Sequence, residues 1–124
     1  MKLKKINIAG QDYLLCFSAL VMSACEEKDT SLPELLERIE TDTQQGKVST
    51  TFWLLYQMLL AGAAYAKRHS LANPDVPEYE DMLAEIDITD LESVKTSIYT
   101  TITHDNKANV EVEPSKNQET TPGD

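Results

Sequence analysis

The strongest constraint on the fold is an apolar segment from Phe52 to Ala66, in which Gln57 is the one clearly polar residue. A helix that is apolar nearly all round has to be buried in a protein core or in a membrane. Crossing a bilayer takes about 20 apolar residues. This segment is shorter, so we predict that it forms the buried central helix of a globular domain. The small residues of AGAAYA (61–66) would let another element approach it closely.

The chain has 124 residues, enough for one domain with a modest core. It carries 11 Lys and Arg against 21 Asp and Glu, a formal net charge of -10. Proteins bind nucleic acid by neutralising phosphates with basic side chains, and an anionic membrane surface repels an acidic chain. We therefore expect neither nucleic acid nor a membrane as partner. A small acidic interaction module that mimics DNA and binds a basic protein is one alternative.

Residues 13–25, YLLCFSALVMSAC, allow two interpretations that imply different compartments. In an exported lipoprotein they would be the hydrophobic region of a signal peptide, residues 1–24 would be removed, and Cys25 would carry lipid. In a soluble domain they would be a strand followed by a helix. Asp12 counts against the signal peptide, because it puts a negative charge at the border where such peptides are positive.

An N-terminal β-hairpin over residues 4–17 accounts for the same region. Ile6 and Ile8 alternate with polar neighbours, and Gly10 allows a tight turn. The second strand would turn one face inward, made of Tyr13, Leu15 and Phe17. The long apolar run is then two elements placed end to end.

Capping signals predict where the helices begin. Ser18 is placed to cap the first helix, and Ser31 with Glu34 has the spacing of a capping box before the second. Thr89 and Glu92 repeat that spacing before the last helix. The other start signals are Pro33 in the second helix, Ser49 or Thr50 before the central helix, and Pro77 in a short helix.

The spacing of apolar residues predicts the inner face of each helix. The faces are Ala19, Leu20, Met22 and Ala24; Leu32, Leu35, Leu36 and Ile39; Tyr79, Met82, Leu83 and Ile86; and Leu91, Val94, Ile98 and Ile102. The last of these assignments competes with a strand, because the run TSIYTTIT (96–103) is rich in β-branched residues.

After Thr103 the chain has almost no large apolar residues and is rich in Asn, Glu, Pro, Lys and Thr. Such a segment cannot bury enough surface to offset its ordering entropy. The sequence therefore predicts an α+β, mainly helical fold, with an N-terminal β-hairpin followed by four to five helices. One globular domain would span residues 1–103, and a disordered, acidic tail would span residues 104–124.

No catalytic, cofactor-binding or metal-binding set can be assembled from the sequence. The four glycines stand alone, so no phosphate-binding loop is predicted. Cys16 and Cys25 lack a Cys-x-x-Cys spacing, and His69 and His104 lie far apart. We expect both cysteines to be small buried hydrophobic residues. A nucleophile needs a base nearby, and no such pair is indicated, so we expect an interaction module and not an enzyme.

The order of these parts resembles the tail assembly chaperones of long-tailed, siphovirus-type bacteriophages and prophages. INIAGQDYLLCFS (6–18) looks like their opening, two strands around an Asn/Ala-Gly turn with a final Phe. The helices that follow in the family correspond here to SALVMSACEE (18–27), LPELLERIE (32–40), FWLLYQMLLAGAAYA (52–66) and YEDMLAEIDITDLESVKTSIYTTI (79–102). The likeness covers roughly residues 3–103 and rests on layout and a handful of residues.

This resemblance implies a holdase in the host cytoplasm, without catalytic residues or cofactors. Such chaperones bind the tape-measure protein, a very long and largely helical chain that sets tail length, until tail-tube subunits polymerise around it. Many phages also make a longer form by ribosomal frameshifting, whose added domain is thought to recruit the tail-tube protein. Self-association as a homo-oligomer would suit this role, because many copies are needed to coat one long chain.

A long amphipathic helix is bound most readily in an apolar groove. We predict that Trp53, Tyr56 and Leu60 of the central helix are the partner-binding residues. The simpler alternative is that all three belong to the core, as large apolar residues usually do.

Overall fold

The structure, a computed structural model, describes the backbone of residues 3–110 and the side chains of residues 3–103. Two strands and five α-helices make up this part: β1 (Lys4–Ile8), β2 (Gln11–Leu15), α1 (Ala19–Glu27), α2 (Leu32–Gln44), α3 (Ser49–Arg68), α4 (Tyr79–Glu85) and α5 (Leu91–Val110). A 3-10 turn, η1 (Ile88–Asp90), joins the last two helices. The predicted mainly helical α+β fold with an N-terminal hairpin is confirmed.

The hairpin turns through a two-residue loop. Ala9 and Gly10 both have positive φ angles, 54° and 83°, which is the geometry that matches the twist of an antiparallel pair. Ile8 pairs with Gln11 beside the loop, and Ile6 pairs with Tyr13. Ile6, Ile8 and Tyr13 are buried in the core, as the alternation of the sequence predicted.

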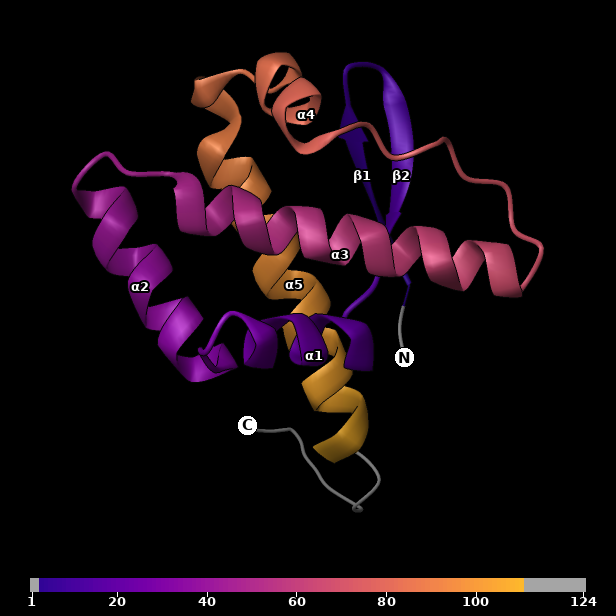
Figure 1. The fold of residues 1–124 in the computed structure, drawn as a ribbon, viewed down its shortest axis with the longest axis horizontal. Coiled ribbons are helices and arrows are strands. Elements are labelled where there is room, and N and C mark those ends of the chain that lie inside the picture. The colour runs from indigo at the N-terminus through magenta and orange to yellow at the C-terminus, as the bar shows by residue number, and fades with distance from the viewer. Residues whose placement is uncertain (1–2, 111–124) are drawn as a thin grey trace.

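Helix α3 is the centre of the domain. Figure 1 shows it crossing the front of the molecule, with α5 passing behind it, and β2, α1, α2 and α5 all contact it. Its inward side chains have no exposed surface; they are Leu54, Leu55, Met58 and Leu59. Strand β2 approaches α3 at Gly62, and the Cys16 N–H donates to the Met58 carbonyl at 3.3 Å. The predicted buried central helix and the predicted close approach at its small residues are both confirmed.

Two helices begin as their capping signals predicted. The Ser18 side chain accepts a hydrogen bond from the Leu20 N–H at the start of α1. Ser31 and Glu34 form a complete capping box at the start of α2, with Pro33 in the first turn. Each pair satisfies backbone N–H groups that a helix start leaves without partners.

The predicted cap of α3 is wrong. Val48 occupies the cap position and no side chain caps the helix there, while Ser49 is already helical. The Thr50 hydroxyl donates instead to the Asp42 carboxylate near the end of α2, at 3.1 Å. The Thr50 hydroxyl therefore bonds to a neighbouring helix, whereas its spacing predicted a bond to the backbone of its own helix.

The predicted starts of α4 and α5 are wrong as well. Helix α4 begins at Tyr79, so Pro77 precedes it. At the last helix, Asp87 accepts hydrogen bonds from the N–H and the hydroxyl of Thr89, which opens η1 in place of a capping box between Thr89 and Glu92. Asp87 lies two residues before Thr89, the spacing at which an aspartate side chain accepts from the backbone N–H of a local turn.

Helix α1 is rotated relative to the prediction. Val21 and Cys25 are buried, while Leu20 and Met22 are 56% and 39% exposed. A nine-residue helix that packs against one neighbour buries a narrow stripe, here two residues spaced four apart. The predicted inner face through Ala19, Leu20, Met22 and Ala24 is therefore wrong, because apolar residues surround this helix and their spacing does not fix its rotation.

Helix α5 resolves the choice between helix and strand. Its β-branched run is helical, and Val94, Ile98 and Ile102 are buried as predicted. Burial of this stripe outweighs the weak preference of β-branched residues for strands. The helix continues to Val110, so residues 104–110, predicted to be tail, are helical. The rest of the predicted tail, residues 111–124, lies outside the described residues.

Candidate functional site

The predicted binding residues lie on one side of α3, which we call the outer face of α3. It consists of the residues of this helix that are half-buried or exposed along its middle: Trp53, Tyr56, Gln57, Leu60, Ala63 and Ala64. Spacings of three, four and seven place them on one side of a helix. The structure therefore brings together Trp53, Tyr56 and Leu60, as the sequence predicted.

Two aromatic residues form the edges of this face, and both pack partly against the core. The Lys28 ammonium lies 5.0 Å from the centre of the Trp53 ring, a cation–π contact with the residue that follows α1. The Tyr56 hydroxyl donates to the Pro77 carbonyl at 2.7 Å, and its ring meets the edge of Tyr79 with centres 5.3 Å apart. Both rings are thus held in place by neighbouring segments before any partner binds.

Leu60 lies about one turn beyond Tyr56 and two turns beyond Trp53 on α3, and it differs from them. It is 41% exposed, and the next turn presents only the small side chains of Ala63 and Ala64. An apolar side chain flanked by small ones lets another helix approach closely. Ser49–Arg68 contains no Asp or Glu, and Lys67 and Arg68 lie in its last turn. The outer face of α3 therefore carries no charge and is followed by a basic last turn, on a chain whose net charge is -10.

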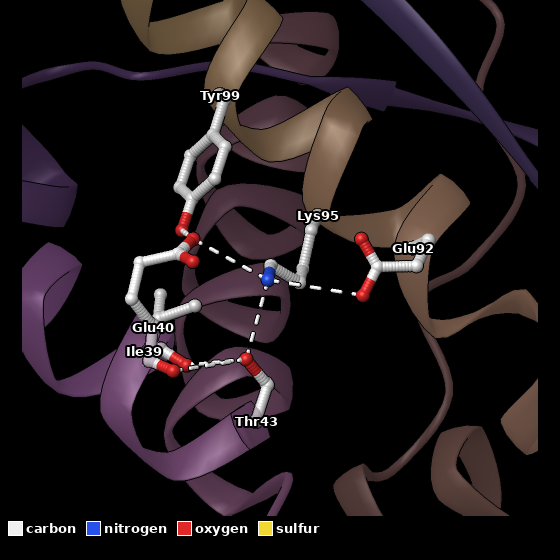
Figure 2. A network of polar contacts seen from close by, with 6 residues as sticks. All are labelled: Ile39, Glu40, Thr43, Glu92, Lys95 and Tyr99. Atoms are coloured by element: carbon white, nitrogen blue, oxygen red, sulfur yellow. Dashed lines mark hydrogen bonds and ion pairs between the residues drawn. The ribbon is translucent and has the colours of Figure 1, made fainter.

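A polar cluster joins α2 to α5 (Figure 2). The Lys95 side chain is 10% exposed, and its ammonium lies 3.3 Å from the Glu40 carboxylate, 3.2 Å from the Thr43 hydroxyl and 3.8 Å from the Glu92 carboxylate. The Tyr99 hydroxyl also donates to Glu40. A nearly buried ammonium needs such partners, because burying an unpaired charge is costly. The cluster therefore fixes α5 against α2.

The protonation states in this cluster suit a structural role. Hydrogen bonds from Tyr99 and then from Lys95 hold the pKa of the Glu40 carboxyl below its usual value. Burial, followed by the hydrogen bond to Glu40, raises the pKa of Tyr99 far above its usual value. Glu40 thus stays ionised as an acceptor, and Tyr99 stays protonated as a donor. Because the pKa values of both groups are shifted away from neutral pH, the pair is poorly matched to acid–base catalysis.

Replacing Glu40 with glutamine is expected to change the acid dependence of stability. The pKa of Glu40 is lower in the folded state than its unfolded value near 4.5. Its contribution to the free energy of unfolding is therefore complete above the unfolded pKa and is lost as the pH falls through the folded pKa. Glu40→Gln should therefore be less stable than the wild type at pH 7, and the difference should shrink in acid. Urea unfolding from pH 7 down to pH 3 measures this.

Glu37→Gln on the same helix is the matched control for that experiment. Glu37 is exposed and forms no ion pair with Lys95, so its amide should leave the slope of stability with pH close to that of the wild type. A Glu40→Gln deficit that stays constant down to pH 3 would contradict the ionic role of Glu40.

Both cysteines are buried, as predicted, and they are not joined in a disulfide. Cys25 is 1% exposed, and burial followed by the charge of Glu26 raises the pKa of its thiol. In this fold both cysteines therefore act as small apolar residues of the core.

Among residues 3–103, whose side chains the structure describes, no group of three or more His, Cys, Asp or Glu side chains is arranged to hold a metal ion. None of the helices described over residues 3–110 is long and apolar enough to cross a membrane.

Sequence reasoning missed the Lys95 cluster and several exposed apolar residues. Glu40 and Lys95 are far apart in the sequence, so no local spacing indicates their contact. Leu20 and Met22 were assigned to the core because the rotation of α1 could not be predicted from its sequence, but both are exposed. Ile88 is also exposed, and it lies in η1, a turn that no motif predicted.

Comparisons with protein-family models, curated proteins and solved structures gave no match.

Proposed function

We propose that this protein is a non-enzymatic tail assembly chaperone of a long-tailed bacteriophage or prophage, which binds the tape-measure protein before the tail tube polymerises. The observation that carries this proposal is the outer face of α3. There Leu60 is exposed in the turns that follow the anchored rings of Trp53 and Tyr56, on a helix without acidic residues. The resemblance of residues 3–103 to this family supplies the identity of the partner.

An amphipathic helix of the tape-measure protein would lie along α3. Its apolar stripe would cover Trp53, Tyr56 and Leu60 in turn, and the small side chains of Ala63 and Ala64 would let its backbone come close. Because both rings already have fixed contacts, little side-chain entropy is lost when the partner binds.

The acidic balance serves solubility in this proposal. A long apolar chain coated with many copies of a protein of net charge -10 is repelled from other coated chains. The chaperone would act in the host cytoplasm, where the tape-measure protein is made. Recruitment of the tail-tube protein by a longer frameshifted form would be a second step, and it concerns sequence beyond the described residues.

The test uses tagged full-length protein purified from host cells during phage production, with co-purifying proteins identified by mass spectrometry. The wild type should recover a very long helical protein in the soluble fraction. Leu60→Glu puts a charge in the centre of the outer face of α3 and should lower that recovery at least about tenfold, as loss of a central interface contact does.

Ile88→Glu is the control for the added charge, because Ile88 is also an exposed apolar residue but lies in η1 and not on α3. It should recover as much partner as the wild type. Equal recovery by the two variants would rule out the outer face of α3 as the binding site. Absence of any long helical partner from the wild-type sample would rule out the chaperone function.

A further inference from the structure

Strand β1 has an outer edge without a partner in the described part of the chain. The sheet consists of β1 and β2 alone, and the pair beside a two-residue loop, Ile8 and Gln11, exchanges hydrogen bonds. The pairs alternate along the ladder, so the backbone N–H and C=O groups of Lys5 and Asn7 point away from β2. Leu14, opposite Lys5, confirms this geometry on the other edge, where its N–H donates to Asn73 at 2.9 Å.

A pocket of about 210 Å³ lies beside this strand. Apolar side chains of β1, of the end of α4 and of α5 line it, with two exposed carboxylates at its rim; they are Ile6, Ile8, Ile86 and Val94, with Glu85 and Asp90. The other end of β1 is basic, because Lys4 and Lys5 are there. Neither lysine forms an ion pair within the described residues. One strand therefore has a basic end and, at its other end, an acidic apolar pocket.

We propose that two copies of this protein associate through their β1 edges, antiparallel about a two-fold axis at Ile6, to form a continuous four-stranded sheet. A two-fold interface requires a surface that complements itself. An antiparallel pairing of β1 with β1 meets this condition, because it places the basic end of each strand beside the acidic pocket of the other copy.

The register follows from the outward backbone groups. Lys5 of each copy exchanges hydrogen bonds with Asn7 of the other, and Ile6 lies opposite Ile6. Shifting the strands so that Lys5 faces Lys5 would place like charges directly opposite each other, which is destabilising. The proposed register avoids that pairing and uses both outward residues of each edge.

Side-chain alternation then places Lys4 of one copy opposite Ile8 of the other. Lys4, Ile6 and Ile8 share the face of the strand that adjoins the pocket, so the Lys4 ammonium reaches the rim formed by Glu85 and Asp90 of the second copy. Ile6 and Ile8 are buried in their own domain and add little free surface to the contact. The interface thus combines backbone hydrogen bonds with two symmetric charge contacts, and it does not depend on the proposed function.

Sedimentation velocity of the full-length chain, over a micromolar to submillimolar concentration series, tests the proposal. The wild type should show a monomer–dimer equilibrium. Asn7→Pro removes an outward N–H from the β1 edge and should raise the dimer dissociation constant at least about tenfold. A wild type that stays monomeric over the whole series would overturn the proposal.

Asp12→Pro is a closely matched control. Asp12 pairs with Asn7, and the two side chains share one hydrogen bond of 2.8 Å, so both variants lose that bond and both place proline at an outward position of the same hairpin. The two variants differ in the edge that carries the proline and in one loop contact, because Asn7→Pro alone also loses the hydrogen bond from the Gly10 N–H to the Asn7 side chain at 3.2 Å. Asp12→Pro should dimerise like the wild type. Equal dissociation of both variants, with circular dichroism showing that both are folded, would exclude the β1 edge.

A charge exchange tests the register separately. Lys4→Glu should weaken the dimer because it faces the acidic rim, and adding Glu85→Lys and Asp90→Lys should restore association to within a few-fold of the wild type. Failure of this restoration in a folded triple variant would exclude the proposed register.

Discussion

Replacing Gly62 with alanine is expected to destabilise the domain by at least about 3 kcal/mol, the upper end of the cost of forcing extra atoms into a packed core. A Cβ at this position would lie 1.9 Å from the Leu14 carbonyl oxygen and 2.6 Å from its carbon. Both are backbone atoms of β2, so relief requires moving the strand away from α3. Urea unfolding at pH 7 measures the loss.

The sign of this effect separates packing from helix propensity. Gly62 lies inside α3, where alanine is ordinarily favoured over glycine by about 1 kcal/mol. If only propensity mattered, Gly62→Ala would be more stable than the wild type. Ala63→Gly, at the next and half-buried position, is the control and should cost about 1 kcal/mol. A Gly62→Ala variant as stable as the wild type would show that β2 does not pack on α3 at this point.

The same contact shows what a sequence can and cannot reveal about this fold. The cluster of small residues around Gly62 indicated that something approaches α3 closely, and that prediction is confirmed. The residue that approaches Gly62, Leu14, lies in a hairpin that the alternation of apolar residues predicted. Nothing in either segment indicates that the hairpin packs on α3. The local sequence predicts the helices and strands and the positions where their side chains are small. Which distant elements pack together depends on the whole domain.

Helix starts illustrate the competition between local signals. The capping box of Ser31 and Glu34 formed as its spacing predicted, with each backbone N–H donating to the other residue's side chain. Thr89 had the same spacing to Glu92, but Asp87 lies two residues before it and accepts from it. Thr50 was lost to Asp42 of another helix. Spacing therefore predicts a cap reliably only where no stronger partner competes for the same group.

The candidate site was predictable to a similar degree. Trp53, Tyr56 and Leu60 share a helix face by spacing alone, and the structure confirms that placement. Spacing did not indicate which of them is exposed, because exposure depends on the segment that contributes Pro77 and Tyr79 and on Lys28 after α1. Leu60 is exposed because neither of these segments reaches it.

The same substitution at two adjacent leucines should therefore lower the free energy of unfolding to very different extents. Leu59 has no exposed surface, and Leu59→Ala should lower the free energy of unfolding by about 3 kcal/mol, since it removes buried methyl groups and leaves a cavity. Leu60 is 41% exposed, and Leu60→Ala should cost less than about 1 kcal/mol. Urea unfolding of both variants, with identical chemistry at neighbouring positions, measures the difference.

This pair also separates stability from binding. If the outer face of α3 holds the partner helix, Leu60→Ala should reduce partner recovery while the domain stays as stable as the wild type. Leu59→Ala should reduce recovery only in proportion to the unfolded fraction, because its side chain points into the core. Equal unfolding costs for the two leucines would mean that α3 is turned differently on its axis, and the face that binds would then have to be sought on the other side of the helix.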